Sequence, residues 1–205
     1  MEINLNVAVN SWLVFWSTYW VFGICISLYT HFNNIRPIVN GFNVFLTLLM
    51  NMFYSLLAVI FLTFLPLRTM TNYNIFIKLF LTYVITDIWF YHIHVFSHHP
   101  KLYKKLHKMH HYEFMNKPYA LTALYCSWFE CVFVNVFSVG LGCVIFQITE
   151  PYIYIWFFVV SLNSLLSHSG LVIPFIVDGY HDDHHTVTNK NFGLTPYLDI
   201  LYGTN

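Results

Sequence analysis

Long apolar runs are the feature that most restricts what this chain can fold into. Four runs, at about 12–30, 42–65, 121–148 and 152–176, approach or exceed the roughly 20 helical residues that cross a hydrocarbon core of about 30 Å. Of the 205 residues, 58% are hydrophobic and 9% are charged, whereas soluble proteins average about 25% charged residues. The sequence therefore predicts an all-α integral membrane bundle with about four transmembrane helices.

Polar turns group these runs into two helical hairpins. A turn at 33–37, which contains the helix breaker Pro37, separates the first pair, and Glu150 with Pro151 separates the second. We expect one membrane domain, with an N-terminal hairpin at 1–70 and a histidine-rich region at 71–205. The first run follows no basic segment and no small-residue cleavage site, so it is expected to stay in the membrane rather than be removed as a signal peptide.

A fifth run, at about 75–98, is apolar enough to span but also carries charges and histidines. A lysine cluster follows it and marks the cytoplasmic side; its members are Lys101, Lys104, Lys105, Lys108 and Lys117. A full span would place Arg68 and Lys78 on the opposite side, against the positive-inside tendency. We therefore expect this run to lie at the interface or to dip partway, with a full span as the alternative.

Nine of the twelve histidines fall into four short clusters beside these runs. The clusters read HxxxH, HxxHH, HSG and HxxHH, and they contain His94, His98, His107, His110, His111, His168, His181, His184 and His185. Counting membrane crossings returns all four clusters to one cytosolic surface. Imidazole is the commonest neutral metal ligand, and a single zinc ion needs only about four ligands, so nine histidines predict more than one metal ion. We expect structural roles for His31, His92 and His99, which lie outside this pattern.

Helix geometry supports a shared site. Residues 87, 91, 94 and 98 fall on one face of a helix, and the three histidines of an HxxHH motif fan out over about 100°, so that one turn can serve two adjacent ions. Asp87, Tyr91 and Asp182 are candidate hydrogen-bond partners of the metal ligands. The alternative for Asp87 is a structural pairing with Lys78 or with a backbone group.

The donor set favours iron. Magnesium and calcium prefer oxygen ligands, and zinc performs no redox chemistry, whereas iron binds imidazole and activates dioxygen. The resulting hypothesis is a non-haem di-iron oxygenase that acts on a lipid. The alternatives are a membrane metal-binding or transport protein without catalysis, and an inactive scaffold that keeps the fold. The formal net charge is zero and gives no argument for a nucleic-acid partner, so none is expected.

Small residues within the apolar runs have structural explanations. Each of the four cysteines, Cys25, Cys126, Cys131 and Cys143, stands alone and is expected to be a buried small hydrophobe rather than a ligand or half of a disulfide. Gly140 and Gly142 lack the third glycine of a dinucleotide-binding motif. They predict close helix packing instead.

Four ordered motifs resemble the fatty acid hydroxylase superfamily of membrane di-iron enzymes, which includes sterol oxidases and desaturases and sphingolipid hydroxylases. They read DIWFYHIHVFSHHPKLYKKLHKMHH, HSGLVIP, HDDHH and NFGLTPYLDILYGTN, and they extend from about Asp87 to Thr204. HSG followed by proline, then HDxHH, then a closing DxxxGT are most similar to the C-4 methylsterol oxidase branch. Pro118, Glu130 and the turn Asn34-Ile35-Arg36-Pro37 are also similar to features of that branch.

The resemblance implies specific cofactors and partners. The nine clustered histidines would bind two iron ions, O2 would be the co-substrate, and electrons would come from NAD(P)H through a separate cytochrome b5 or its reductase. The substrate would be a lipid, most like a sterol, with fatty acyl or sphingolipid hydroxylation and sterol desaturation as alternatives. The protein would reside in the endoplasmic reticulum membrane with its metal site facing the cytosol. The lysine cluster would contact an acidic electron donor or lipid headgroups, or serve only to set the topology.

Overall fold

The computed structural model describes residues 4–65, 72–112, 117–173 and 177–205, and all its regular elements are helical. The long helices are α1 (Leu5–Phe32), α2 (Gly41–Thr63), α3 (Ile75–Ser97), α6 (Phe137–Phe146) and α7 (Tyr152–Ser167). Shorter helices are α4 (Tyr103–Leu106), α5 (Lys108–Tyr112), α8 (Tyr180–Thr186) and α9 (Pro196–Tyr202). A 3-10 helix, η1 (Ala120–Leu124), and a π-helix, η2 (Glu130–Val136), lie between α5 and α6. The predicted all-α bundle is confirmed.

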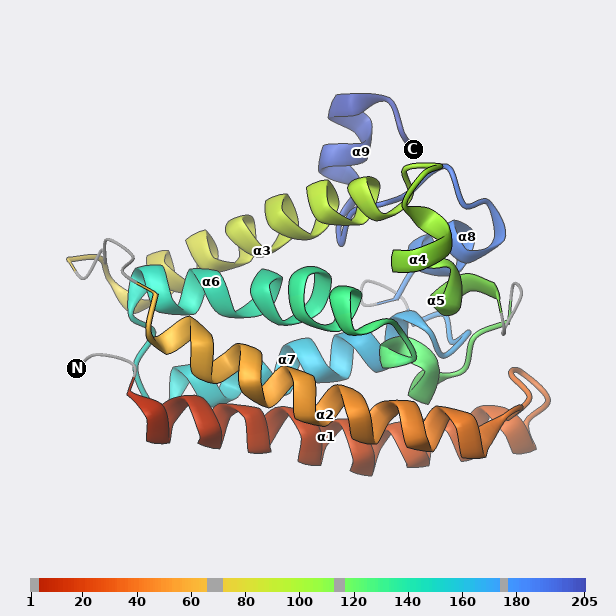
Figure 1. The fold of residues 1–205 in the computed structure, drawn as a ribbon, viewed down its shortest axis with the longest axis horizontal. Helices are drawn as coiled ribbons and strands as arrows, with labels where there is room; N and C mark the ends of the chain where they lie inside the picture. Colours follow the sequence, from red (N-terminus) through yellow and green to blue (C-terminus); the bar gives the residue numbers. More distant parts are fainter. Residues whose placement is uncertain (1–3, 66–71, 113–116, 174–176) are drawn as a thin grey trace.

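The long helices form three layers. Figure 1 shows α1 and α2 side by side at the base, α6 and α7 in the middle, and α3 on the opposite side. Helix α7 packs along α1, and α6 packs along α3. The short helices α4, α5 and α8 gather at one end of the bundle, where the carboxyl ends of α3 and α7 also lie (Figure 1). The segments that carry the clustered histidines therefore meet at one end of the molecule.

Close packing between α6 and its neighbours depends on glycine. A Cβ atom added to Gly142 would lie 2.8 Å from the Cα atom of Thr82 on α3, and one added to Gly140 would lie 2.6 Å from a side-chain carbon of Leu62 on α2. Real Cβ atoms do not approach other atoms so closely, so Gly142, which faces backbone, requires glycine as the helices stand, whereas a Cβ atom at Gly140 would require the Leu62 side chain to shift. The prediction that these glycines serve helix packing is confirmed.

The helix bounds match the apolar runs only in part. Within the described residues, α1, α2 and α3 are long and apolar enough to cross a membrane, and the segments Glu130–Phe146 and Tyr152–Ser167 are apolar but shorter. The helices are shorter than the apolar runs at 121–148 and 152–176. The first run is interrupted between η1 and η2. In the second, α7 ends at Ser167, after which Gly170 adopts a positive φ of 72°, and residues 174–176 lie outside the described part of the chain.

Asn51 explains why the interruption is tolerated. Its side-chain amide donates to the carbonyl oxygens of Leu124 at 2.8 Å and of Cys126 at 3.1 Å. Backbone carbonyl groups outside regular helices need such partners where water is scarce. Polar side chains also join α1 to α2, because Ser55 Oγ accepts hydrogen bonds from the indole N–H groups of Trp12 and Trp16, each at 3.0 Å. Hydrogen bonds of this kind stabilise helix pairs in membranes.

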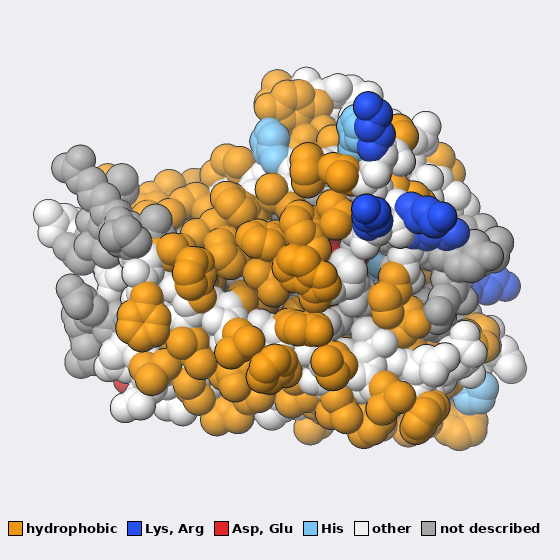
Figure 2. Space-filling view, viewed as in Figure 1, with side chains coloured by type: hydrophobic (Ala, Val, Ile, Leu, Met, Phe, Trp, Pro, Cys, Tyr) orange, Lys and Arg blue, Asp and Glu red, His pale blue; other side chains and the backbone are white. Residues whose placement is uncertain are grey.

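The surface fits an integral membrane protein. Large apolar side chains are exposed along α1, α2 and α3, including Phe42, Phe53, Phe76 and Phe80. Figure 2 shows apolar side chains covering much of one face, with lysine and arginine side chains gathered towards the end where α4 lies. Hydrocarbon is the environment that suits the apolar face, so the chain is an integral membrane protein. Whether α3 spans the bilayer or lies at its interface stays a prediction, and Arg68, on which that argument partly rests, falls outside the described residues.

The cysteines follow the prediction with one exception. Cys126, Cys131 and Cys143 are buried and unpaired. Cys25 is also unpaired but is exposed, so its predicted burial was wrong. It lies on the outer side of α1 between exposed Ile24 and partly buried Ile26, where lipid rather than protein is the expected neighbour.

Candidate metal centre

The nine clustered histidines come from four segments and meet at one end of the bundle. His94 and His98 end α3, His107 to His111 lie along α4 and α5, His168 follows α7, and the last three belong to α8. Their side chains form two groups, and within each group one ring nitrogen from every histidine lies within 4.8 Å of those of the others. Group one contains His94, His98, His107, His111 and His184, and group two contains His110, His168, His181 and His185.

Within each group, the Nε2 atoms point at one another. In group one, Nε2 of His107 lies 3.0 Å from Nε2 of His94 and 2.9 Å from Nε2 of His111. In group two, Nε2 of His168 lies 3.3 Å from that of His110 and 3.1 Å from that of His181. Two nitrogens bound at about 2.1 Å to one ion at a right angle would be about 3.0 Å apart. The spacing therefore fits two ions, one for each group.

The opposite ring nitrogens, Nδ1, are held by the protein. Nδ1 of His94 lies 2.7 Å from the carbonyl oxygen of Phe192, and Nδ1 of His184 lies 2.6 Å from that of Lys190. Nδ1 of His168 lies 3.0 Å from the carbonyl oxygen of Ser164. Since a carbonyl oxygen only accepts, each of these Nδ1 atoms carries the proton and leaves the Nε2 lone pair free to bind a metal. This is the arrangement found around histidine ligands generally.

Several histidine ring nitrogens in the described part of the chain have no hydrogen-bond partner within the protein. The Nε2 atoms of His98, His184 and His185 are buried there without any hydrogen-bond partner. Leaving a buried polar atom unsatisfied costs roughly 1–3 kcal/mol, so repeated cases at one place require an explanation. A bound metal ion supplies one, because it would accept the lone pair of each nitrogen.

The histidines outside the membrane-spanning helices are held neutral. Burial lowers the pKa of His184 to about 4 and that of His168 to about 4, and it also lowers the pKa of His107, His110 and His185 well below the usual value. Desolvation disfavours the charged imidazolium form. At neutral pH these rings therefore keep the lone pair that a metal ligand needs.

Glu130 joins the two groups. Its side chain is 4% exposed, with Oε2 lying 2.9 Å from Nδ1 of His107 and Oε1 lying 3.8 Å from Nδ1 of His110. Glu130 begins the π-helix η2, a rare geometry that is frequent at functional sites. The sequence analysis noted Glu130 only as a family-like feature and gave it no place in the site. It is the only Asp, Glu, Lys, Arg or His in the run 121–148, and that isolation was the available signal.

Asp87 and Tyr91 contact the C-terminal segment rather than the histidine rings. Asp87 accepts hydrogen bonds from the backbone N–H groups of Leu194 and Thr195 and, at 2.5 Å, from the Thr195 hydroxyl. The Tyr91 hydroxyl lies 2.9 Å from that of Thr204. The structure thus has the backbone pairing that was the alternative for Asp87. These contacts fasten the loop whose Phe192 carbonyl contacts His94.

Asp199 completes this attachment and was missed as a functional residue. It is fully buried and accepts hydrogen bonds from the backbone N–H groups of Phe192 and Gly193 and from the hydroxyls of Tyr180 and Thr204. It opens the DxxxGT motif, which the sequence analysis used only for resemblance. A carboxylate with four donors fixes the C-terminal segment against α8.

Asp182 pairs with Arg36, at 2.8 Å between a carboxylate oxygen and a guanidinium nitrogen. Arg36 comes from the turn between α1 and α2, so this ion pair joins the N-terminal hairpin to α8. The turn comes close to Gly170, where an added Cβ atom would lie 2.3 Å from Nε of Arg36. The HSG motif therefore leaves room for the arginine.

The remaining histidines lie outside both groups. Nδ1 of His31 accepts from the backbone N–H of Ile38, Nδ1 of His92 lies 2.7 Å from the carbonyl oxygen of Ile88, and Nδ1 of His99 accepts from the backbone N–H of Lys101. All three contacts are local to a helix end or a single helix turn. They fit the structural roles expected for these residues.

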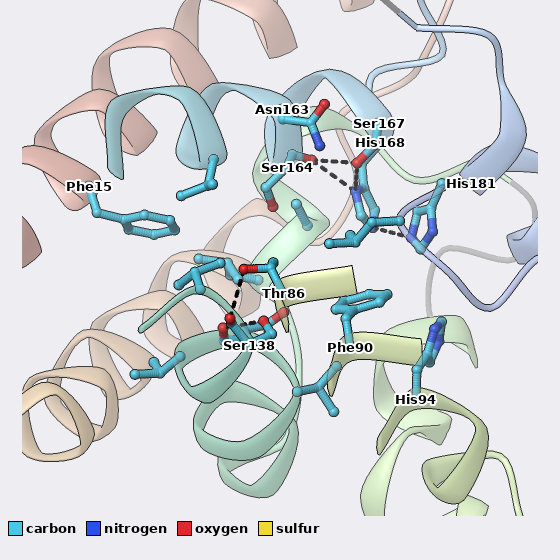
Figure 3. Close-up of a pocket in the computed structure, with 18 of the residues that line it drawn as sticks. Phe15, Thr86, Phe90, His94, Ser138, Asn163, Ser164, Ser167, His168 and His181 are labelled. Atoms are coloured by element: carbon cyan, nitrogen blue, oxygen red, sulfur yellow. Dashed lines mark hydrogen bonds between the residues drawn. The ribbon is translucent and has the colours of Figure 1, made fainter. Parts of the chain in front are cut away.

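A cavity of about 410 Å³ adjoins the histidines. Its walls come from α1, α2, α3, η2, α6 and α7, and at one end it reaches His94, His107, His110, His168 and His181. Figure 3 shows His94, His168 and His181 at that end, with Phe90 and Thr86 from α3 along one wall and Phe15 from α1 farther away. A mainly apolar cavity that ends at a polar centre is typical of a small-molecule site.

Comparison with known proteins agrees with this site. Fatty acid hydroxylase ahd1 of Mycosarcoma maydis is 35% identical over 123 residues, which cover 60% of this chain and 32% of that protein. Methylsterol monooxygenase 1 of Gallus gallus is 29% identical over 132 residues, covering 60% and 44%. Sphingolipid C4-hydroxylase sur2 of Schizosaccharomyces pombe is 29% identical over 155 residues, covering 68% and 52%. The matches thus span between about a third and a half of these relatives, and no solved structure matches.

The family assignment rests on the region that carries the histidines. The fatty acid hydroxylase family model matches residues 79–204, which is more than half of the chain and includes most of α3, both HxxHH motifs, His168 and Asp199. The chain belongs to the fatty acid hydroxylase family.

Proposed function

We propose that this chain is a membrane-bound non-haem di-iron oxygenase that uses O2 and an external electron donor to oxidise a C–H bond of a lipid. The observation that carries the proposal is the pairing of two convergent histidine groups with a cavity that reaches both of them. The five histidines of group one would hold one iron ion, and the four histidines of group two would hold the other. When bound, the two ions would activate O2, which is the oxidant, for attack on an unactivated C–H bond.

The protein's own residues perform three tasks in this proposal. The carbonyl oxygens of Phe192 and Lys190 orient the rings of His94 and His184 so that Nε2 faces the centre. Glu130 contacts the Nδ1 side of His107 and lies close to that of His110, so it orients a ligand in each group and balances positive charge. The apolar walls exclude water and hold the lipid against the metals.

The preferred substrate is a sterol, with chemistry like that of a C-4 methylsterol oxidase. Similarity to methylsterol monooxygenases and the closing DxxxGT motif support this choice. The similarity to a sphingolipid C4-hydroxylase supports the alternative of a fatty acyl or sphingolipid hydroxylase. Sterol desaturation by the same centre is a further alternative.

Electrons would come from NAD(P)H through a separate carrier such as cytochrome b5 or its reductase. Exposed Lys101, Lys104 and Lys105 lie beside the histidine end of the bundle and offer a positive surface to an acidic partner. We place the protein in the endoplasmic reticulum with this end in the cytosol, because clustered lysines mark the cytoplasmic side.

Complementation tests the proposal. The chain would be expressed in a strain that lacks sterol 4-methyl oxidase, and its sterols would be analysed by mass spectrometry. Restored removal of the C-4 methyl groups, together with about two iron ions per purified chain, is the expected result. Normal protein levels and iron content without sterol oxidation would reject the sterol substrate and favour the alkyl-lipid hydroxylases. Purified protein that binds no iron would reject the di-iron centre itself.

A further inference from the structure

Most polar side chains that line the cavity are already hydrogen-bonded within the protein. Ser55 Oγ accepts from Trp16 Nε1, the Thr86 hydroxyl donates to the carbonyl oxygen of Ser138, and Trp156 Nε1 donates to that of Val139. These groups have partners and need none from a ligand. They leave the middle of the cavity effectively apolar.

Asn163 and Ser164 differ from these side chains because they lack hydrogen-bond partners in the described part of the chain. Among the described residues, neither the side-chain amide of Asn163 nor the hydroxyl of Ser164 has a hydrogen-bond partner, although both residues line the cavity. Tyr83, near the far end of the cavity on α3, also lacks one. Figure 3 shows Asn163 and Ser164 on the last turns of α7, next to Ser167 and His168. Asn163 is exposed and Ser164 is half-buried, and both line the cavity, so their polar groups are accessible to a ligand bound there.

The pair lies close to the histidines. Asn163 precedes His168 by five residues, which is about 7 Å along a helix axis. His168 belongs to group two, where its Nε2 atom lies 3.1 Å from that of His181. A polar group bound at Asn163 and Ser164 would therefore place carbons within a few bonds of it beside the metal centre. The rest of the lipid would extend towards Phe15 and Trp156.

The charged side chains around the cavity indicate whether the polar group of the ligand is neutral or anionic. No lysine or arginine is among the described residues that line it, whereas the carboxylates Glu130 and Asp178 are. At Asn163 and Ser164 a fatty acid carboxylate or a phosphate headgroup would find no lysine or arginine partner among the described lining residues. An amide and a hydroxyl together offer donors and acceptors, which suits a neutral group that also does both.

We propose that Asn163 and Ser164 form a subsite for the hydroxyl group of a neutral lipid alcohol, and that the carbon to be oxidised lies within a few bonds of that hydroxyl. The second part rests on the proposed oxygenase function, whereas the binding does not. A sterol with a 3-hydroxyl and a ceramide with a 3-hydroxyl share this chemistry. Free fatty acids and phospholipids lack it.

Binding to a redox-inert form separates this inference from catalysis. The full chain, loaded with zinc in place of iron and held in lipid nanodiscs, would be titrated with a 4,4-dimethyl-3-hydroxysterol and its 3-deoxy analogue. A ceramide with its 3-deoxy analogue, and octadecanoic acid, would form the other arms. Displacement of a radiolabelled sterol gives each affinity. We expect at least one hydroxylated lipid to bind about tenfold more tightly than its deoxy partner, the effect of about one hydrogen bond, and octadecanoic acid to bind weakly.

The lipid pairs and the protein variants together test whether Asn163 and Ser164 bind the hydroxyl group. A preference in the sterol pair or in the ceramide pair identifies which lipid alcohol is bound. Asn163→Leu with Ser164→Ala should remove the preference. Asn43→Leu, which changes an exposed asparagine at the start of α2 and outside the cavity, should keep it. The proposed subsite would be overturned if, in the unaltered protein, the sterol and the ceramide each bound with the same affinity as its 3-deoxy analogue. It would also be overturned if octadecanoic acid bound most tightly of all the lipids tested. If the iron-loaded protein forms no product while the zinc form keeps its hydroxyl preference, only the proposed oxygenase function fails.

Discussion

The Glu130 carboxylate lies 2.9 Å from Nδ1 of His107, on the side of the ring opposite the convergent Nε2 atoms. The contact is buried, and the second carboxylate oxygen faces His110 of the other histidine group. One side chain therefore influences ligands of both predicted metal ions.

Glu130→Gln should weaken metal binding without unfolding the chain. The amide keeps the shape but loses the charge, and loss of such a partner typically costs 10–100-fold in metal affinity. Titration of the metal-free protein with ferrous iron measures the effect at both sites. Glu150→Gln, an exposed carboxylate remote from the histidines, serves as the control. Unchanged affinity in Glu130→Gln would mean that the carboxylate does not support the ligands.

Alanine substitutions should remove the two metal ions separately. His111→Ala takes a ligand only from group one, and His185→Ala takes one only from group two, so each is expected to reduce the iron content from about two per chain towards about one. Elemental analysis of purified protein provides the measurement. His92→Ala, which changes a histidine outside both groups, should retain full occupancy. Equal loss of iron in all three variants would contradict the division into two groups.

The ion pair between Arg36 and Asp182 should couple the N-terminal hairpin to α8. A double-mutant cycle with Arg36→Ala and Asp182→Ala is expected to give a coupling free energy of about 1–2 kcal/mol, between the values for exposed and buried pairs. Denaturant unfolding in detergent supplies the four free energies of unfolding. A coupling indistinguishable from zero would show that the two side chains act independently.

Gly142→Ala should destabilise the packing of α6 on α3. The new methyl group would lie 2.8 Å from Cα of Thr82, and forcing extra volume into a tight contact costs about 1–3 kcal/mol. Thermal unfolding compares it with Gly41→Ala, where the nearest atom would be 3.8 Å away and the change should be small. A melting temperature for Gly142→Ala as high as that of the control would exclude close packing at this contact.

The sequence was sufficient for features that depend on local periodicity. Apolar length predicted α1 and α2, and the 100° fan of HxxHH predicted that one motif can contribute to two adjacent sites, but not that His110 would be the histidine that joins the second group. The break before Glu130 was not predictable, because the apolar character continues through it and the Asn51 side chain that stabilises it lies far away in sequence. Asp199 was missed for a similar reason, since its donors come from separate segments that only the folded chain brings together.

The shortness of α7 has a consequence for the depth of the histidines if this helix crosses the bilayer. A helix of 16 residues is about 24 Å long, about 6 Å less than the hydrocarbon thickness of a typical bilayer. A helix of this length that starts at one membrane surface places His168 below the headgroups of the other leaflet. Hydrophobic mismatch would then thin the bilayer around the protein and draw lipid headgroups towards the histidines. A lipid bound there would need to rise only a short way out of its leaflet to reach them.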